Sequence, residues 1–293
     1  MPSTRDIRRR IKSVKNTAQI TKAMQMVASS KMRKAQLAAL VGRPYAATMN
    51  RMLAELLSGH GGDFSHPLME RREGGKRCLI VVGTDKGLCG ALNSTLFREA
   101  IKYDKDTTVF ITAGRKAAQF VARARRQLVA EFSYKDSPQF DEARAISRFA
   151  QDHFLAGEFN QVDVLFTNFI STLSQRPEVL SLLPIAEIRG VSSDQHGEDL
   201  GTALQASGAE FLFEPSAERV LGALLPHYLN FRMFQVLLEA KASEHSSRMV
   251  AMKNATDNAK QLIKDLTLEY NKLRQANITK ELLEITTAQM ALG

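Results

Sequence analysis

The sequence predicts a mixed α/β fold, in which an antiparallel coiled coil of long N- and C-terminal helices accompanies an α/β head with a largely parallel sheet. Three observations predict it. No glycine or proline occurs in residues 3–41 or in residues 227–292. Because these two residue types most often interrupt regular structure, each segment is expected to form one long helix. Between them, apolar runs suited to buried strands alternate with helix-like segments.

The first segment repeats apolar residues at the spacing of a coiled-coil seam. Lysines and arginines largely occupy its other faces. Gly42-Arg43-Pro44 is expected to interrupt the helix, with residues 45–57 continuing it. The predicted seam consists of Ile7, Ile11, Val14 and Ala18, followed on a slightly shifted face by Ile20, Met24 and Val27.

The last segment has the same spacing. At 1.5 Å per residue it would reach ~100 Å, against ~60 Å for the first. Both helices are too polar to fold into a core, so we expect them to pair with each other, antiparallel, near Ala18 and Leu266. The longer helix must then overhang. Its predicted seam is Met252, Ala255, Ala259, Leu262, Leu266, Leu273 and Ala276, with a second apolar stretch at Ile278, Leu282 and Ile285.

The middle of the chain predicts right-handed βαβ units on a largely parallel sheet, a Rossmann-like arrangement. The continuous apolar run CLIVV at residues 78–82 is typical of a strand buried on both faces. Further strands are expected at 107–112, 128–132 and 162–169, with 178–188 following, and helices at 88–102, 115–126 and 141–157.

This pattern predicts three domains. Residues 1–58 form an N-terminal coiled-coil helix, residues 76–190 the α/β head, and residues 217–293 a C-terminal coiled-coil helix. Residues 59–75 are expected to be a linker, and residues 191–216 a surface loop with a short strand at 210–214.

Composition excludes several classes of protein. No apolar run approaches the ~18 residues of a membrane span. The basic start has no apolar stretch behind it, which disfavours a secretory signal, and its pattern continues far past Lys22, which disfavours a mitochondrial transit peptide. Two cysteines, Cys78 and Cys89, indicate a reducing compartment, and six scattered histidines lack metal-site spacing.

The charge is concentrated in the first helix. The chain carries a net charge of +9, and residues 1–58 hold twelve lysines and arginines against Asp6 and Glu55. A basic helix of this kind can bind nucleic acid, an anionic membrane or an acidic protein. Residues 1–44 contain no aromatic side chain for base stacking. A coiled-coil tether or a nucleic-acid-binding scaffold stays open at this point.

The most site-like segment is residues 82–90, which follows a strand and opens a helix. A phosphate loop would occupy that place. The segment is neither GxGxxG nor GxxxxGK[ST], so a tight strand-to-helix turn is favoured. We therefore expect no catalytic, cofactor-binding or metal-binding residues in this chain.

Several stretches, in order along the chain, resemble the gamma subunits of bacterial F-type ATP synthases. The resemblance implies a central rotor shaft inside a ring of three alpha and three beta subunits, whose rotation takes the three catalytic beta sites through their conformations in turn. It implies a proton-translocating complex and a subunit without a catalytic site. The matching stretches are DIRRRI (6–11), ITKAMQMVA (20–28), KMRKA (31–35), RPY (43–45), TDKGLCG (84–90), SEHSSRMVAMKNATDNA (243–259) and YNKLRQANITKEL (270–282).

The resemblance also implies partners and contact residues. The epsilon subunit would bind the head, residues 278–292 would sit in an apolar sleeve, and basic side chains would meet acidic loops of beta rather than nucleic acid. The chain would be peripheral at the cytoplasmic side of the cell inner membrane, with no cofactor. Met24, Arg248, Gln275, Thr279 and Glu281 would face the catalytic ring, and Phe211, Phe213 and Glu214 the membrane ring of c subunits.

Overall fold

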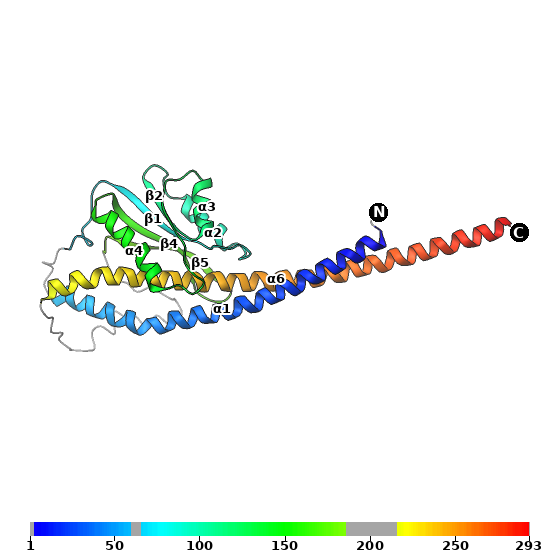
Figure 1. Ribbon diagram of the computed structural model, residues 1–293, viewed down its shortest axis with the longest axis horizontal. Helices are drawn as coiled ribbons and strands as arrows, with labels where there is room; N and C mark the ends of the chain where they lie inside the picture. Colours follow the sequence, from blue (N-terminus) through cyan, green and yellow to red (C-terminus); the bar gives the residue numbers. More distant parts are fainter. Residues whose placement is uncertain (1–2, 60–65, 186–215, 293) are drawn as a thin grey trace. The chain divides into compact units, whose positions relative to one another are not determined.

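The computed structural model describes residues 3–59, 66–185 and 216–292 (Figure 1). The chain divides into two compact units: a paired-helix unit, residues 1–28 and 249–293, and a head unit, residues 29–248. The three domains named above remain a prediction. In order, the elements are α1 (Thr4–Gly59), β1 (Lys76–Val82), α2 (Leu92–Ile101), β2 (Thr108–Ala113), α3 (Arg115–Arg123), β3 (Leu128–Phe132), α4 (Phe140–Leu155), β4 (Phe159–Phe169), β5 (Gln175–Leu183) and α6 (Ala217–Leu292).

The head unit contains a five-stranded sheet in the order β3-β2-β1-β4-β5. Pairs among the first four strands are parallel, while β5 runs antiparallel to β4. Cys78 of β1 pairs with Val109 on one side and Val162 on the other, so β1 is the central strand. The largely parallel sheet predicted from alternating strands and helices is confirmed, and β3 matches its predicted range.

Each face of the sheet is covered by helices, which explains why β1 is apolar without alternation. Cys78, Ile80 and Val82 point into a core shared with α4, α6 and the second half of α1. Leu79 and Val81 point into a smaller core with α2 and α3. In that smaller core the rings of Phe97 and Phe120 stack with centroids 4.3 Å apart.

The predicted interruption at Gly42-Arg43-Pro44 is wrong, because α1 runs through Pro44. Helix α6 likewise runs through Pro226. A proline inside a helix removes a hydrogen bond and costs about 3 kcal/mol. Packing offsets this cost in the head unit. The Tyr45 ring lies 4.9 Å from that of Phe231, and Leu225 and Tyr228 are buried on either side of Pro226.

The paired-helix unit is antiparallel, as predicted. Arg8 Nη2 donates to Tyr270 Oη at 2.6 Å, and the hydroxyl oxygens of Thr21 and Thr256 lie 2.7 Å apart. These two contacts place Leu266 opposite the turn around Ile11. The expected pairing near Ala18 is therefore shifted by about two helical turns.

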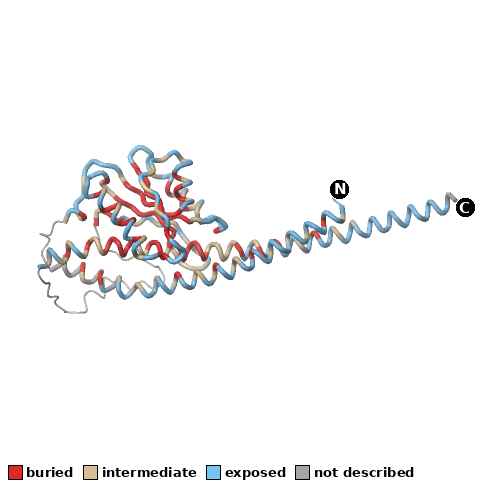
Figure 2. Tube along the Cα trace, viewed as in Figure 1, coloured by how far each residue is buried: buried red, intermediate tan, exposed pale blue. Residues whose placement is uncertain are grey.

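The seam differs from the prediction in four places. Ile20, Val27 and Leu262 are exposed by 61%, 56% and 42%, so assigning them to the seam was wrong. The next residue along the helix takes each place: Thr21, Ala28 and Ile263. The 3-4 spacing of the seam continues without a shift through these positions. Ala276 is also exposed rather than in the seam. Buried residues recur on the facing sides of the two helices (Figure 2), namely Ile7, Thr21 and Ala28 on α1, and Met252, Thr256, Ala259 and Leu266 on α6.

Candidate functional site

The loop between β1 and α2 turns sharply. Leu88 has φ 62° and Gly90 has φ 60°, which are left-handed backbone conformations that reverse the chain. Consequently α2 begins at Leu92 rather than at residue 88 as predicted. Gly114, which has φ 101°, supports the same loop from the next crossover. A Cβ there would lie 2.4 Å from the carbonyl oxygen of Gly83, so the close backbone approach requires glycine.

Carbonyl groups of this loop face α6. Arg248 Nη2 donates to the carbonyl oxygens of Lys86 and Gly87, each at 3.3 Å. Ser247 Oγ donates to the carbonyl oxygen of Cys89 at 2.6 Å. A phosphate cradle directs N–H groups at its ligand. This loop instead directs carbonyl groups at α6, where they accept hydrogen bonds from the Arg248 guanidinium. The arrangement agrees with the predicted tight turn, which α6 holds in place.

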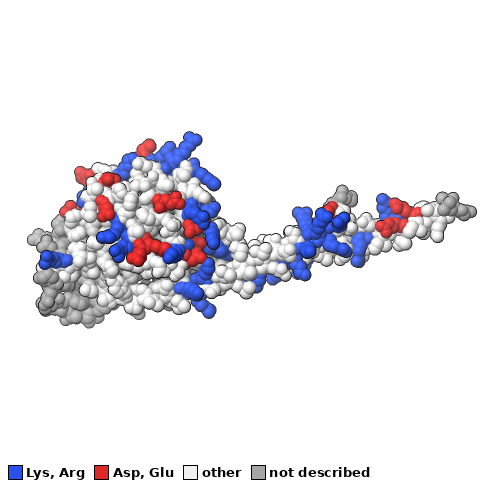
Figure 3. Space-filling view, in the orientation of Figure 1, with Lys and Arg blue, Asp and Glu red and all other residues white. Residues whose placement is uncertain are grey.

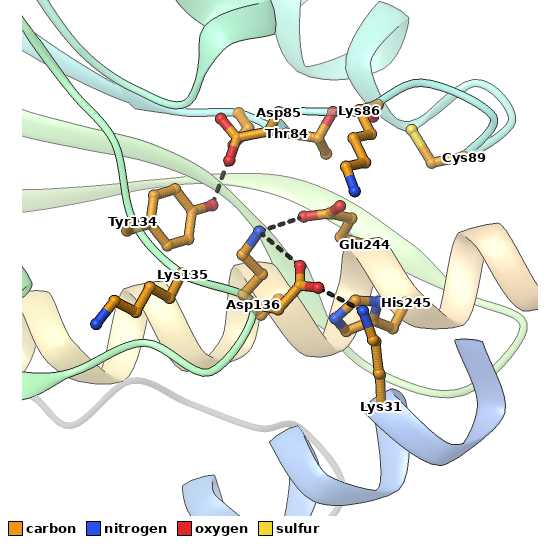
Figure 4. Close-up of polar contacts among 12 residues, drawn as sticks. Lys31, Thr84, Asp85, Lys86, Cys89, Tyr134, Lys135, Asp136, Glu244 and His245 are labelled. Atoms are coloured by element: carbon orange, nitrogen blue, oxygen red, sulfur yellow. Dashed lines mark hydrogen bonds and ion pairs between the residues drawn. The ribbon is translucent and has the colours of Figure 1, made fainter. Parts of the chain in front are cut away.

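A charged cluster lies on the same face of α6 (Figure 4). Glu244 bridges two cations: Lys241 Nζ donates to its Oε2 at 2.9 Å, and Arg248 Nη2 donates to its Oε1 at 2.8 Å. The Lys241 and Glu244 side chains are only 1% and 4% exposed. Buried charges of this kind need close partners, because desolvation costs several kcal/mol for each ion.

The loop between β3 and α4 completes the cluster. Asp136 forms an ion pair with Lys31 of α1, and its Oδ1 lies 3.8 Å from Lys241 Nζ. Tyr134 donates its hydroxyl hydrogen to the carbonyl oxygen of Gly83 at 3.0 Å, and Lys241 Nζ lies 4.5 Å from the centre of its ring. An ammonium at that distance gains a cation–π attraction.

The cluster shifts the pKa values of its members. The hydrogen bond from Lys31 lowers the pKa of Asp136, with Lys241 adding to the effect. Burial lowers the pKa of His245 to about 4, so its imidazole is neutral at pH 7. Its Nδ1 lies 3.4 Å from Arg248 Nη1, and its buried Nε2 has no hydrogen-bond partner among the described residues. Burial also raises the pKa of Tyr134.

The contact residues predicted from the resemblance fall in different places. In the paired-helix unit, Gln275, Thr279 and Glu281 are exposed and Met24 is half-buried. In the head unit, Arg248 is 12% exposed and engaged by Glu244 and the loop carbonyls. Phe211, Phe213 and Glu214 lie outside the described residues.

Sequence reasoning missed Lys241, Glu244 and Asp136. A signal for two of them was present, since Lys241, Glu244 and Arg248 follow one another at 3-4 spacing. That spacing puts all three on one helix face. This face continues the stripe of Val236, Leu237 and Ala240, which are buried in the core. No local pattern marked Asp136, whose partners lie more than a hundred residues away in the sequence.

No candidate metal site occurs in the part of the chain that the structure describes. Its His, Cys, Asp and Glu side chains form no group of three or more that could hold a metal ion. Both cysteines are buried and unpaired, and burial raises the pKa of each thiol, so neither is a reactive thiolate at neutral pH.

Comparisons with known proteins agree with this architecture. The family model described as ATP synthase matches residues 3–292. The chain is 50% identical to the ATP synthase gamma chain of Opitutus terrae, with 99% of each chain covered, and 45% identical to that of Methylacidiphilum infernorum over the whole of both.

Solved structures are also similar. A chain from the central stalk and c-ring of Tetrahymena thermophila mitochondrial ATP synthase is 26% identical, with a TM-score of 0.60 over 80% of this chain and 99% of that one. The rotor of Euglena gracilis mitochondrial ATP synthase, 18% identical, shares the fold with a TM-score of 0.63 over 94% of this chain and 98% of that one. The predicted resemblance and central-stalk role are confirmed: this chain belongs to the family of ATP synthase gamma chains.

Proposed function

We propose that this chain is the rotor subunit that couples rotation of a membrane ring to sequential conformational change at three catalytic beta sites of a proton-translocating F-type ATP synthase. The family match over residues 3–292 and the likeness to central-stalk chains support this role. The chain itself carries no catalytic site and biases which state each beta subunit adopts, a coupling free energy between sites.

The observation that carries the proposal is the unequal length of the paired helices. Thr4, at the start of α1, falls opposite the turn around Leu273 in the register set by Thr21 and Thr256. Beyond that turn α6 continues to Leu292. Large apolar side chains are exposed there, which suits a tip enclosed by a ring of other subunits. They are Ile278, Leu282, Leu283, Ile285 and Met290, exposed by 48–84%.

Exposed and half-buried residues on the paired helices are the proposed contacts with the catalytic ring. Gln275, Thr279 and Glu281 lie on the unpartnered part of α6, and Met24 lies beside the seam. The Thr279 hydroxyl donates to the carbonyl oxygen of Gln275 at 2.9 Å, so its methyl group and helix face stay available. Arg248 of the head unit is the fifth proposed contact.

Electrostatics favour an acidic protein partner. Lys and Arg side chains gather near the start of α1 (Figure 3). Those of Arg5, Arg8, Arg9, Arg10, Lys12 and Lys15 are exposed. Acidic loops of beta would bind this surface through charge complementarity, and the absence of aromatic residues in residues 1–44 removes the stacking that single-stranded nucleic acid requires.

We place the chain at the membrane through its partners. Among the described helices, none is both long enough and apolar enough to cross a bilayer. We propose peripheral attachment on the cytoplasmic side of the cell inner membrane, through the c-subunit ring and the epsilon subunit. Phe211, Phe213 and Glu214 are the proposed contacts with the ring.

Reconstitution tests the proposal directly. The purified chain is mixed with the alpha and beta subunits and the mixture is separated by size. We expect one complex containing all three, with ATPase activity that depends on this chain. Failure to form that complex, or the same ATPase activity without the chain, would contradict the proposal. Salt-sensitive binding to duplex DNA at micromolar or lower concentration would support a nucleic-acid role instead.

A further inference from the structure

Five side chains of alternating charge form a continuous chain inside the head unit. Figure 4 shows three of them, Lys31, Asp136 and Glu244, around their shared partners. The ionic chain begins at Lys31 of α1, passes to Asp136 in the loop between β3 and α4, and enters α6 at Lys241. Glu244 continues it to Arg248, whose Nη2 ends it on the carbonyl oxygens of Lys86 and Gly87. The chain therefore joins two helices and two loops that are distant in the sequence.

Burial differs along this ionic chain. The side chains of Lys31 and Asp136 are 43% and 50% exposed, whereas those of Lys241, Glu244 and Arg248 are 1%, 4% and 12% exposed. An exposed ion pair contributes little to stability, but a buried charge that loses its partner is strongly destabilised. The three buried side chains, Lys241, Glu244 and Arg248, therefore depend on one another for charge compensation. The half-exposed pair of Lys31 and Asp136 sets where the loop between β3 and α4 is held.

Lys241 is the central member. Its ammonium is held by Glu244 at 2.9 Å, by Asp136 at 3.8 Å and by the Tyr134 ring at 4.5 Å. Two of those three partners belong to the loop between β3 and α4. Tyr134 in turn holds the carbonyl oxygen of Gly83 at the start of the other loop. Lys241 thus couples the position of the loop between β3 and α4 to the position of the loop between β1 and α2.

We infer that Lys241 and Asp136 are positioning residues for Arg248, and that the ionic chain fixes the loop of Lys86 and Gly87 against α6 in one arrangement. This inference rests on the proposed function, in which Arg248 meets the catalytic ring. Without Lys241, Glu244 loses its Oε2 partner and Arg248 loses a fixed carboxylate. The loop then detaches locally from α6 while the strands and the apolar core stay folded.

The two cysteines report this local opening. Cys89 lies in the loop and is 2% exposed, with its carbonyl held by Ser247. Cys78 lies in the central strand and is fully buried. Loop opening exposes Cys89 alone, whereas global unfolding exposes both thiols. The rate of alkylation by N-ethylmaleimide, measured for each cysteine by mass spectrometry, separates the two events.

The variants are Lys241→Met, which keeps the length of the side chain without its charge, and Lys241→Arg, which restores a cation. In Lys241→Met we expect Cys89 alkylation about tenfold faster with Cys78 unchanged, and near-normal rates in Lys241→Arg. Asp136→Asn, at a half-exposed site, gives a smaller increase and serves if Lys241→Met does not fold. Lys102→Met, which removes an exposed pair with Glu99, is the matched control with no effect.

Coupling is measured in the whole complex in vesicles, as protons pumped per ATP hydrolysed. We expect Lys241→Met to assemble and hydrolyse ATP but to pump about threefold less per ATP, with recovery in Lys241→Arg. Unchanged Cys89 alkylation, equal acceleration at Cys78, or unchanged pumping in the assembled variant would overturn the inference. Failure of the wild-type chain to assemble would instead contradict the proposed function, and the alkylation rates would still be readable on the purified chain.

Discussion

The hydroxyl oxygens of Thr21 and Thr256 lie 2.7 Å apart, buried in the seam between α1 and α6. Thr256 Oγ1 also lies 2.8 Å from the carbonyl oxygen of Met252, and Thr21 Oγ1 lies 3.1 Å from that of Ala18. Either hydroxyl can therefore donate across the seam while the other donates within its own helix. A polar pair at an otherwise apolar seam is satisfied in one register only. The two threonines therefore specify how the paired helices align.

Removing this pair tests its contribution. We expect Thr21→Val and Thr256→Val each to lower the free energy of unfolding by about 1 kcal/mol, because each leaves a buried hydroxyl with one partner fewer. The double variant should lose less than the sum, since two methyl groups then face each other. Urea unfolding followed by circular dichroism gives the three values. Additive losses would show that the hydroxyls do not interact.

The register itself predicts a specific crosslink. Ala18 falls opposite Ala259, so cysteines at these two positions should form a disulfide on mild oxidation, which requires Cα atoms within about 7 Å. Cysteines at Ala18 and Leu266 should not, because Leu266 lies two turns further along α6. The wild-type chain is the control, since Cys78 and Cys89 are buried. A crosslink with Leu266 and none with Ala259 would contradict the register.

Much of the fold was predictable because the signals were local. The absence of glycine and proline marked both long helices, and the run of Cys78 to Val82 marked the central strand. The register was not predictable, because apolar spacing alone allows a shift by a whole heptad. The exposed positions of Ile20 and Leu262 have the same cause. Their hydrophobicity favoured them for the seam, but the helix geometry places Thr21 and Ile263 there instead.

The candidate site was predictable only in part. Family resemblance pointed to Arg248, and the 3-4 spacing of Lys241 and Glu244 was visible in the sequence. Their depth in the head unit was not, because a charged helix face is usually solvated. Asp136 could not be found in advance, since its pairing depends on where the sheet brings the loop between β3 and α4.

Two glycines should respond oppositely to alanine. Gly42 is inside α1, and a Cβ there would lie 3.6 Å from Phe231 Cζ, an ordinary contact. We expect Gly42→Ala to raise the free energy of unfolding by about 0.5–1 kcal/mol, because alanine favours the helix. Gly114→Ala, with φ 101° and a Cβ 2.4 Å from Gly83 O, should lower it by about 2 kcal/mol or more. Urea midpoints check both, and a stabilising Gly114→Ala would contradict the close approach.

Acid should destabilise the head unit through His245. Burial lowers its pKa from the ordinary 6.5 to about 4, with Glu244, Arg248, Asp136 and Lys241 as charged neighbours. The unfolded chain therefore binds a proton between these pH values that the folded chain does not, so stability falls as pH drops from 6.5 toward 4. Between pH 7 and pH 5 we expect a loss on the order of 1–2 kcal/mol from this residue.

His245→Gln isolates that contribution, because glutamine does not titrate. The difference in free energy of unfolding between wild type and variant should shrink at pH 5 relative to pH 7. Asp136 does not interfere, since its pKa lies below the ordinary 3.8 and its contribution is lost only at lower pH. Parallel pH profiles for the two proteins would contradict this, because they would mean that His245 has the same pKa in the folded and the unfolded state.

Shortening α6 separates the part that stabilises the chain from the part that is left for partners. Ending the chain after Ala276 removes the exposed side chains of Ile278, Leu282 and Ile285 and no buried residue among those described. The thermal midpoint of the purified chain should stay within about 2 °C of wild type. Ending it after Asp265 also removes Leu266, 6% exposed, and the Tyr270 partner of Arg8, so that midpoint should fall.

In the reconstituted complex the truncation after Ala276 should matter, because it removes the apolar tip of α6, which is the proposed contact with the surrounding ring. We expect the chain ending at Ala276 to assemble less tightly, or to hydrolyse ATP with less pumping, despite its unchanged midpoint. A lower midpoint in the purified chain would mean that the overhang folds against α1 after all. An unchanged midpoint with full pumping would mean that coupling needs the paired part of α6 and not its tip.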